Sequence, residues 1–272
     1  MRLDLFLYHM QVLSSPQNKI IKDLIALSEK SKLRKQRGLF VLEGKREFEI
    51  AMKSGYDLHT AFVQPELLDK SSISKQLENH SCFEVTTELY AKIAYRGSTE
   101  GIICIFKQKD HELSKYQLPN TSPLFLVLES IEKPGNLGAI FRSADAANID
   151  AVIITEPIAD LYNPNCLRSS LGCALSIPSI VCTNENLQLF FEKNNIRSYA
   201  ATLQNSNNYL EEDYTGAAAF IVGSEAKGLK AFWRKNASQN IVIPMRGAID
   251  SMNVSVAASI LLFEAIRQRS SF

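Results

Sequence analysis

Short apolar runs alternate with helix-like segments along residues 124–269. The runs predict strands at Leu124–Leu128, Ala151–Thr155, Ser198–Thr202, Ala217–Val222 and Ile241–Pro244. The segments between and after them predict helices at Leu137–Asn148, Asn163–Leu171, Asn184–Asn194 and Asn253–Arg269. Strands that alternate with helices are typical of an α/β fold with a mostly parallel sheet. In such folds, ligands bind beyond the carboxyl ends of the strands.

The first 110 residues show a weaker form of the same alternation. Asn18 is placed to cap a helix whose apolar residues Ile20, Ile21, Leu24, Ile25 and Leu27 share one face. Further strands are predicted at Leu39–Leu42, Thr60–Val63 and Gly101–Phe106, with helices at Arg46–Lys53 and Thr87–Tyr95. This part of the chain therefore predicts a small α/β domain.

A polar stretch with two prolines, residues 111–123, separates the two patterns and predicts a linker. We therefore expect a first domain at residues 10–110 and a second domain at residues 124–272. Met10 stands just before the first domain, so residues 1–9 are expected to be a short extension or an early start.

Composition excludes several classes of protein. The chain of 272 residues has a formal charge of +1, which excludes disorder driven by charge and a wholly basic coat protein. No apolar run approaches the ~18–20 residues of a membrane helix, and no signal peptide is evident. Five scattered cysteines predict reduced thiols in a cytoplasmic protein. Four histidines without metal spacing predict no metal site.

Positive charge is concentrated between Lys19 and Arg46, where nine basic residues stand against three acidic ones. Such a cluster is typical of a surface that contacts nucleic-acid phosphates. A solvated helix face followed by a basic turn would give the same composition. The charge pattern alone leaves both interpretations open.

Three loops that follow predicted strands carry the candidate chemistry. The first, Glu129–Ala144, contains Asn136 and Arg142 six residues apart. The second, Phe220–Leu229, has two glycines around Glu225, and the third, Ile241–Ala258, leads into the last helix. Each loop alone is compatible with an ordinary turn and a helix cap.

Together, the order and spacing of these loops resemble the three motifs of the SpoU (TrmH-type) RNA ribose 2′-O-methyltransferases of the SPOUT superfamily. The matching segments are Asn136–Ala144, Gly223–Leu229, and Ile243–Gly247 with Ser251–Ala258. Arg168–Gly172 also looks like a family feature. Ser14–Leu27 and Arg37–Arg46 are similar, more loosely, to the accessory RNA-binding domain of the family.

The resemblance implies a deep trefoil knot in the second domain and a homodimer with sites at its two-fold interface. It also implies an S-adenosylmethionine pocket built from the second and third loops. The implied cofactor-binding residues are Val222, Gly223, Gly228, Ile243, Pro244, Met245, Met252 and Asn253. The chain has no Gly-x-Gly-x-x-Gly motif, which counts against a Rossmann-type enzyme.

The resemblance further implies methyl transfer to a ribose 2′-hydroxyl, with Arg142, Asn136, Glu225, Ser251 and Asn253 as catalytic residues. A guanidinium group is a poor general base at neutral pH, so we expect Arg142 to stabilise the developing alkoxide, with or without accepting its proton directly. The residues expected to bind RNA are Lys30, Lys32, Arg34, Lys35, Arg37, Lys45, Arg46 and Arg168. Ribosomal RNA is the expected substrate. A tRNA substrate, methylation of a base, and a catalytically silent RNA-binding protein stay open as alternatives.

Overall fold

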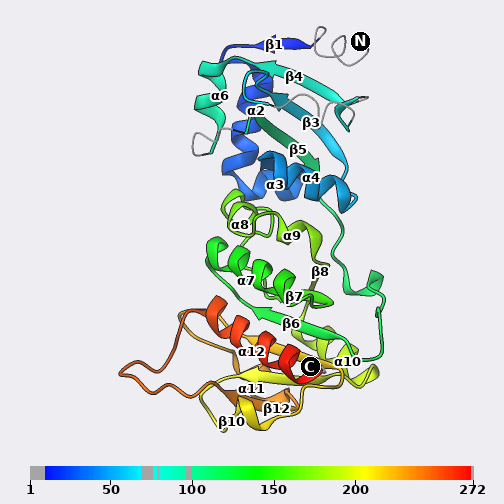
Figure 1. Ribbon diagram of the computed structural model, residues 1–272, viewed down its shortest axis with the longest axis vertical. Coiled ribbons are helices and arrows are strands. Elements are labelled where there is room, and N and C mark those ends of the chain that lie inside the picture. The colour runs from blue at the N-terminus through cyan, green and yellow to red at the C-terminus, as the bar shows by residue number, and fades with distance from the viewer. Residues whose placement is uncertain (1–9, 69–75, 79, 96–99, 271–272) are drawn as a thin grey trace. The chain divides into compact units, whose positions relative to one another are not determined.

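The computed structural model describes residues 10–68, 76–78, 80–95 and 100–270 (Figure 1). Residues 1–9, expected to be an extension, lie outside this range. The chain forms two compact units, Met1–Lys109 with Tyr162–Gly172, and Asp110–Leu161 with Cys173–Phe272. Among the described residues, no helix combines the length and the apolar character needed to cross a membrane.

The first unit contains a mixed five-stranded sheet with the order β1-β4-β3-β5-β2. Strand β5 runs antiparallel to its neighbours β3 and β2, whereas β1, β4 and β3 are mutually parallel. The strands are β1 (Gln11–Leu13), β2 (Leu39–Glu43), β3 (Leu58–Val63), β4 (Ser81–Val85) and β5 (Ile102–Lys107).

Helices within the described residues of this unit include α2 (Lys19–Glu29), α3 (Ser31–Arg37), α4 (Lys45–Lys53), α6 (Thr87–Ile93) and α8 (Pro164–Ser169). The predicted cap of α2 is confirmed, because Asn18 Oδ1 accepts a hydrogen bond of 2.8 Å from the N–H of Ile20. Ile21, Leu24 and Leu27 then face the core.

The segment Tyr162–Gly172 comes from the second half of the chain but packs in the first unit. The ring of Tyr162 is buried, with its centroid 4.4 Å from that of Phe40. Its hydroxyl accepts a hydrogen bond of 3.1 Å from the N–H of Lys109. These contacts fix α8 beside β2.

The second unit is built on a fully parallel seven-stranded sheet with the order β10-β12-β9-β11-β6-β7-β8. Every residue of β6, β7 and β11 is buried, as expected of parallel strands that are covered on both faces. The α/β architecture is thus confirmed. The strands are β6 (Leu124–Glu129), β7 (Ala151–Thr155), β8 (Ser179–Cys182), β9 (Arg197–Ala201), β10 (Asn207–Asn208), β11 (Ala218–Val222) and β12 (Gln239–Val242).

Helices cover both faces of this sheet. Leu187 and Trp233 pack against Phe125 and Ile221 on one face. They come from α10 (Asn184–Lys193) and α11 (Ala231–Asn236). On the other face, α12 (Val254–Arg269) packs against β11 and α7 (Pro134–Ala146), and α7 also packs against α9 (Cys173–Ser176). The knot implied by the resemblance stays a prediction.

Helix α7 begins earlier than the periodicity predicts, at Pro134 instead of Leu137. Proline suits this first helical position because its missing N–H would have no partner there. The earlier start places Asn136 inside the first turn of the helix.

The predicted linker is attached to the edge of the second sheet. Val181 in β8 donates its N–H to the carbonyl oxygen of His111 at 2.8 Å, and His111 Nδ1 lies 2.9 Å from the carbonyl oxygen of Ser179. A 3-10 turn, η1 (Leu113–Lys115), follows. The ring of Tyr116 then packs edge-on against Phe125 at 5.9 Å. Residues 111–116 therefore form part of the second unit.

Candidate active site

A cavity of about 410 Å³ lies at the carboxyl ends of β9, β11 and β12. It is lined by residues 201–204, 222–229, 241–243 and 250–252, together with Met245, Val254, Ala257 and Arg234. This is the edge of a parallel sheet where ligands bind, and the volume falls in the range of ~300–1,000 Å³ that small molecules occupy.

Most of the predicted cofactor-binding residues line this cavity. Val222, Gly223, Gly228, Ile243, Met245 and Met252 all do so, as do the candidate catalytic residues Glu225 and Ser251. Pro244 and Asn253 are not among the lining residues. The second and third loops thus meet around one cavity, as the resemblance implies.

The loop after β11 folds back tightly on itself. The N–H of Gly228 donates to the carbonyl oxygen of Ser224 at 2.9 Å, and Gly228 adopts a φ of +63°. A Cβ atom added at Gly223 would lie only 2.2 Å from the carbonyl carbon of Gly228. Glycine is therefore required at residue 223 for the loop to close.

A chain of side-chain hydrogen bonds joins all three loops. Asn136 Nδ2 donates to Glu225 Oε1 at 2.6 Å, and Asn253 Nδ2 donates to Asn136 Oδ1 at 3.2 Å. Asn253 also caps α12, because its Oδ1 accepts from the N–H of Ser255 at 2.8 Å. Three of the five candidate catalytic residues are thus in direct contact.

Glu225 also accepts a hydrogen bond from the backbone just before α7. Its Oε2 accepts a long hydrogen bond of 3.4 Å from the N–H of Glu132. Partial burial acts to raise the pKa of Glu225, but hydrogen bonds from Asn136 and from backbone N–H groups outweigh it. The net result is a pKa below the ordinary value, so the carboxylate is ionised and can orient the amide of Asn136.

Arg142 does not join this chain of hydrogen bonds. It follows Asn136 by six residues on α7, so it lies about 9 Å farther along the helix and about 120° around it. Its side chain is exposed, and within the described part of the chain it has no hydrogen bond or ion pair. The structure therefore separates Arg142 from the other candidate catalytic residues of the same chain.

The residues predicted to bind RNA divide into two groups. Lys30, Lys32, Lys35, Arg46 and Arg168 are exposed, Lys45 is half-buried, and exposed Arg37 forms an ion pair with Asp23. The structure contradicts the prediction that Arg34 is free to bind RNA. Its side chain is 1% exposed and donates to the carbonyl oxygens of Leu27 and Ser28 at 2.7 and 2.9 Å. Its guanidinium group holds the end of α2 and does not face solvent.

The sequence patterns missed one wall of the cavity. Thr202, Leu203 and Gln204 follow β9 and line the cavity together with the Gly223–Leu229 loop. Their position at the carboxyl end of the predicted strand Ser198–Thr202 was an available signal. However, the strand order that places β9 between β11 and β12 was not evident from the sequence.

Comparison with known families divides the chain at a similar boundary, but it places the segment Tyr162–Gly172 with the second part of the chain. Residues 123–263 match the SpoU rRNA Methylase family, and residues 18–104 match the MRM3-like substrate binding domain. The first match covers slightly more than half of the chain and contains all three motif loops. The second covers most of the first unit.

Relatives that align over nearly the whole chain support both matches. The 23S rRNA (guanosine(2553)-2′-O)-methyltransferase RlmP of Bacillus subtilis is 28% identical over 93% of this chain and 98% of its own length. A solved RNA 2′-O ribose methyltransferase is 34% identical, with a TM-score of 0.81, over 95% of this chain and 99% of that one.

The structure of an AdoMet-bound rRNA methyltransferase from Sinorhizobium meliloti is 26% identical, with a TM-score of 0.85. It covers 96% of this chain and 99% of that chain. Together with the cavity and the three joined loops, these matches show that the chain belongs to the SpoU rRNA methylase family and is an S-adenosylmethionine-dependent RNA ribose 2′-O-methyltransferase.

Proposed function

We propose that this enzyme methylates a ribose 2′-hydroxyl of ribosomal RNA at the mouth of the cavity beside β11. The observation that carries this proposal is the hydrogen-bonded chain Glu225–Asn136–Asn253, which joins the three loops next to that cavity. A relative that aligns over both units of the chain, RlmP of Bacillus subtilis, is named for action on 23S rRNA.

The cavity fits S-adenosylmethionine. Val222, Ile243 and Met252 offer an apolar lining for the adenine ring, and the glycine at residue 223 lets the backbone of the loop close around a ligand. S-adenosylmethionine, when bound, supplies a methyl group that is activated by its sulfonium centre. Backbone groups near Gly223 and Met252 would hold the cofactor.

The residues of the chain then position the ribose and stabilise its charge. Much of the acceleration in such a transfer comes from holding the hydroxyl in line with the methyl group. Ionised Glu225 fixes the amide of Asn136, which presents a defined polar edge to the ribose. The guanidinium of Arg142 stabilises the negative charge that develops on the 2′-oxygen as its proton passes to water, and it binds the neighbouring phosphate.

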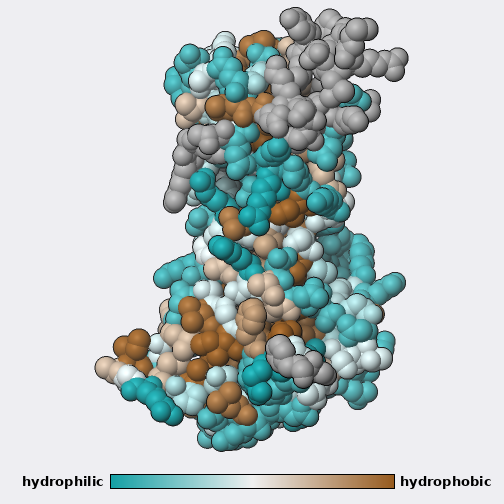
Figure 2. All heavy atoms as spheres, in the orientation of Figure 1, coloured by the Kyte–Doolittle hydropathy of each residue, from teal (hydrophilic) through white to brown (hydrophobic). Residues whose placement is uncertain are grey.

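We propose that two copies of the chain pair so that Arg142 of one copy completes the site of the other. Arg142 leaves α7 on a different side from Asn136, and apolar residues occur on all sides of α12. Val256 and Phe263 of α12 are 49% and 48% exposed. Figure 2 shows apolar residues gathered over the region of the second unit where Figure 1 draws α12.

The first unit binds the RNA in this proposal. Lys32, Lys35 and Arg46 are exposed there and supply salt-sensitive contacts to phosphates. Such contacts are independent of sequence, so they hold the RNA without selecting the methylated nucleotide. The five cysteines are free thiols, which suits an enzyme that works on RNA in the cytoplasm.

The experiment is methyl transfer from labelled S-adenosylmethionine to unmodified rRNA and tRNA pools, by the wild type, Arg142→Ala and Arg197→Ala. Arg197 is a matched control because it is exposed at the amino end of β9, away from the cavity. Label in alkali-resistant dinucleotides from rRNA, lost in Arg142→Ala and kept in Arg197→Ala, supports the proposal.

Label confined to tRNA would identify tRNA as the substrate in place of rRNA. Alkali-sensitive label would show that the methyl group is on a base. Cofactor binding without transfer to either pool would favour a silent RNA-binding protein. The dimer has its own test, since Phe263→Asp should convert a dimer into a monomer in light scattering. A wild type that is monomeric at assay concentration would contradict that part of the proposal.

A further inference from the structure

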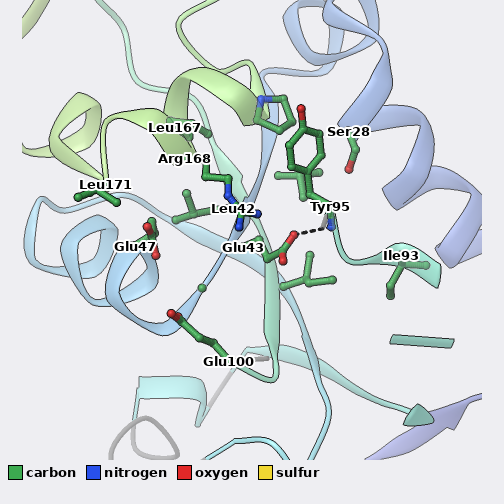
Figure 3. A pocket seen from close by; sticks show the side chains of 14 residues that line it. Ser28, Leu42, Glu43, Glu47, Ile93, Tyr95, Glu100, Leu167, Arg168 and Leu171 are labelled. Atoms are coloured by element: carbon green, nitrogen blue, oxygen red, sulfur yellow. Dashed lines mark hydrogen bonds between the residues drawn. The ribbon is translucent and has the colours of Figure 1, made fainter. Parts of the chain in front are cut away.

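A second cavity, of about 220 Å³, lies within the first unit and has no part in the proposed methyl transfer (Figure 3). Its lining comes from β2, β5, the start of α4, the residues after α6 and the segment Pro164–Leu171 of the same unit. Glu43, Glu47, Glu100 and Arg168 supply its charged groups. The volume lies below the range taken by drug-sized ligands, so it suits a ligand the size of one base.

Two of the carboxylates accept hydrogen bonds from backbone N–H groups. Glu43 Oε2 accepts a hydrogen bond of 2.7 Å from the N–H of Tyr95, and Glu100 Oε2 accepts one of 2.5 Å from the N–H of Lys45. A Cβ atom added at Gly44 would lie 2.4 Å from Glu47 Oε2 and 3.0 Å from Glu100 Oε2. The carboxylates thus converge over a residue that has no side chain, and that residue keeps the cavity open.

The other two charged groups retain their capacity to bind a ligand. Within the described part of the chain, Glu47 and Arg168 make no hydrogen bond or ion pair to another side chain. Burial and the neighbouring Glu100 raise the pKa of Glu47, and Arg168 is close enough to act in the opposite direction. An acceptor and a planar donor therefore face one cavity without satisfying each other.

The rest of the lining suits a flat ring better than a phosphate. Leu42, Ile93 and Leu167 form apolar walls, and Tyr95, 47% exposed, stands at the rim. Three carboxylates repel a phosphate group, although the protein acts on RNA. Bases that leave a stack are held instead by aromatic and guanidinium planes and by hydrogen bonds to their edges.

Guanine is the base whose edges match this arrangement. Its N1–H and N2 amino group are neighbouring donors, which one carboxylate can accept together. Its O6 and N7 atoms are acceptors, and arginine binds them in bidentate fashion. Adenine and uracil do not present this combination of edges.

We propose that this cavity binds an unpaired guanine base of the RNA, with Glu47 accepting from N1–H and the N2 amino group and Arg168 donating to O6 and N7. The inference rests on the proposed role of the first unit in binding RNA. Through this cavity, the first unit would recognise a particular base of the RNA. Contacts between its lysines and phosphates do not provide such recognition.

The test is fluorescence anisotropy with the full chain and four labelled RNA nonamers. Each has eight uridines and a central guanosine, inosine, adenosine or uridine. We expect the guanosine nonamer to bind about tenfold more tightly than the adenosine and uridine nonamers, within the range known for one bidentate base contact. Inosine, which lacks the N2 amino group, should lose part of this preference.

Glu47→Gln and Arg168→Lys should each abolish the preference for guanosine. Arg168→Lys keeps the charge but loses the bidentate geometry, so its affinity for the guanosine nonamer should fall to its affinity for the uridine nonamer. Glu49→Gln is the matched control, because it removes the same charge from α4 outside the cavity lining and should keep the preference. Circular dichroism melting verifies that each variant is folded.

Equal binding of all four nonamers by the wild type would overturn the proposal, as would a guanosine preference that survives in both cavity variants. An equal loss of affinity for all four nonamers in Arg168→Lys would indicate that Arg168 binds a phosphate, which would overturn its assignment to guanine. These readouts are independent of methyl transfer. Failure of the guanine site is therefore distinguishable from failure of the proposed substrate.

Discussion

Asn136 and Glu225 lie 89 residues apart in the chain, and their side chains share a hydrogen bond of 2.6 Å. The bond ties the first turn of α7 to the loop that follows β11. The other end of the Asn136 amide accepts from Asn253, so both of its polar atoms are engaged. One side chain therefore holds the relative positions of the first, second and third motif loops.

We predict that Asn136→Ala lowers the rate of methyl transfer by about 100- to 1,000-fold, the range seen when one aligned hydrogen-bond donor is removed from an active site. Glu225→Ala should act through the same contact. A double-mutant cycle on the rate should therefore give a coupling of about 1–3 kcal/mol between the two positions. Strictly additive effects of the two substitutions would show that the contact has no role in catalysis.

The depressed pKa of Glu225 gives the stability of the second unit a specific pH dependence. Because the folded-state pKa lies below the unfolded-state value of ~4.3, the contribution of Glu225 is fully present above that value. It is lost as the pH falls through the folded-state pKa. The difference in unfolding free energy between the wild type and Glu225→Gln should be largest at pH 6 and shrink as the pH falls through the acid range. A difference that does not change with pH would contradict this assignment.

Gly223→Ala should weaken the binding of S-adenosylmethionine at least tenfold. The added methyl group meets backbone atoms of Gly228 and Leu229 within 2.2–2.4 Å, so the loop must open to accommodate it. Gly216→Ala is the control, because a Cβ atom there meets nothing within 4 Å. Calorimetric titration measures both affinities, and an unchanged affinity in Gly223→Ala would show that this loop does not form the cofactor site.

Arg34 and Lys35 are neighbours in the same basic cluster, and we predict opposite consequences of replacing them. Arg34→Ala should destabilise the first unit by about 2–4 kcal/mol, because two carbonyl oxygens at the end of α2 lose their buried partner. Lys35→Ala should leave stability within about 0.5 kcal/mol but weaken RNA binding in low salt. Thermal melting and binding at two salt concentrations separate the two effects.

A buried network beneath the cofactor loop gives a further prediction. Glu129 is fully buried and accepts from Asn184 Nδ2 at 2.9 Å and from the N–H of Lys230 at 2.7 Å. Asn184 in turn accepts from the indole N–H of Trp233 at 2.7 Å. Glu129→Ala leaves these buried donors without an acceptor, so we expect a loss of about 3 kcal/mol in the free energy of unfolding.

Trp233 is the single tryptophan of the chain, so its fluorescence follows the unfolding of this unit directly. Glu132→Ala is the control, because its side chain is exposed on the neighbouring loop and should change stability by less than about 0.5 kcal/mol. Equal stability of the two variants would show that the network is relaxed by water or by rearrangement.

The sequence correctly predicted elements whose own residues determine their structure. Strand β7 spans Ala151–Thr155, as predicted, because a strand buried on both faces is a continuous apolar run. The last helix was expected to have either Ser251 or Asn253 as its cap, and Asn253 is the cap, because its side chain accepts from the backbone two residues away. The three motif loops, and with them the family, were identified from local residue types and spacing.

Other features depend on contacts that local patterns do not encode. Helix α3 has a single strongly apolar residue, Leu33, so its polar sequence resembles a basic turn. The burial of Arg34 depends on the end of α2, and the packing of Tyr162 in the first unit depends on Phe40. The separation of Arg142 from Asn136 follows from the early start of α7. The positions of Arg34 and Tyr162 were thus decided by tertiary packing.

The segment that runs along β8 has a consequence for handling the isolated second unit. An edge strand with free N–H and carbonyl groups is a template for pairing with another chain, and Val181 at this edge is partly exposed. Residues 111–116 cover it, through the hydrogen bond between His111 and Val181 and the packing of Tyr116. Fragments that start at Asp110 or at Pro123 both expose the segment Tyr162–Gly172, but only the first keeps this cover. The fragment that starts at Pro123 should therefore aggregate more readily than the one that starts at Asp110.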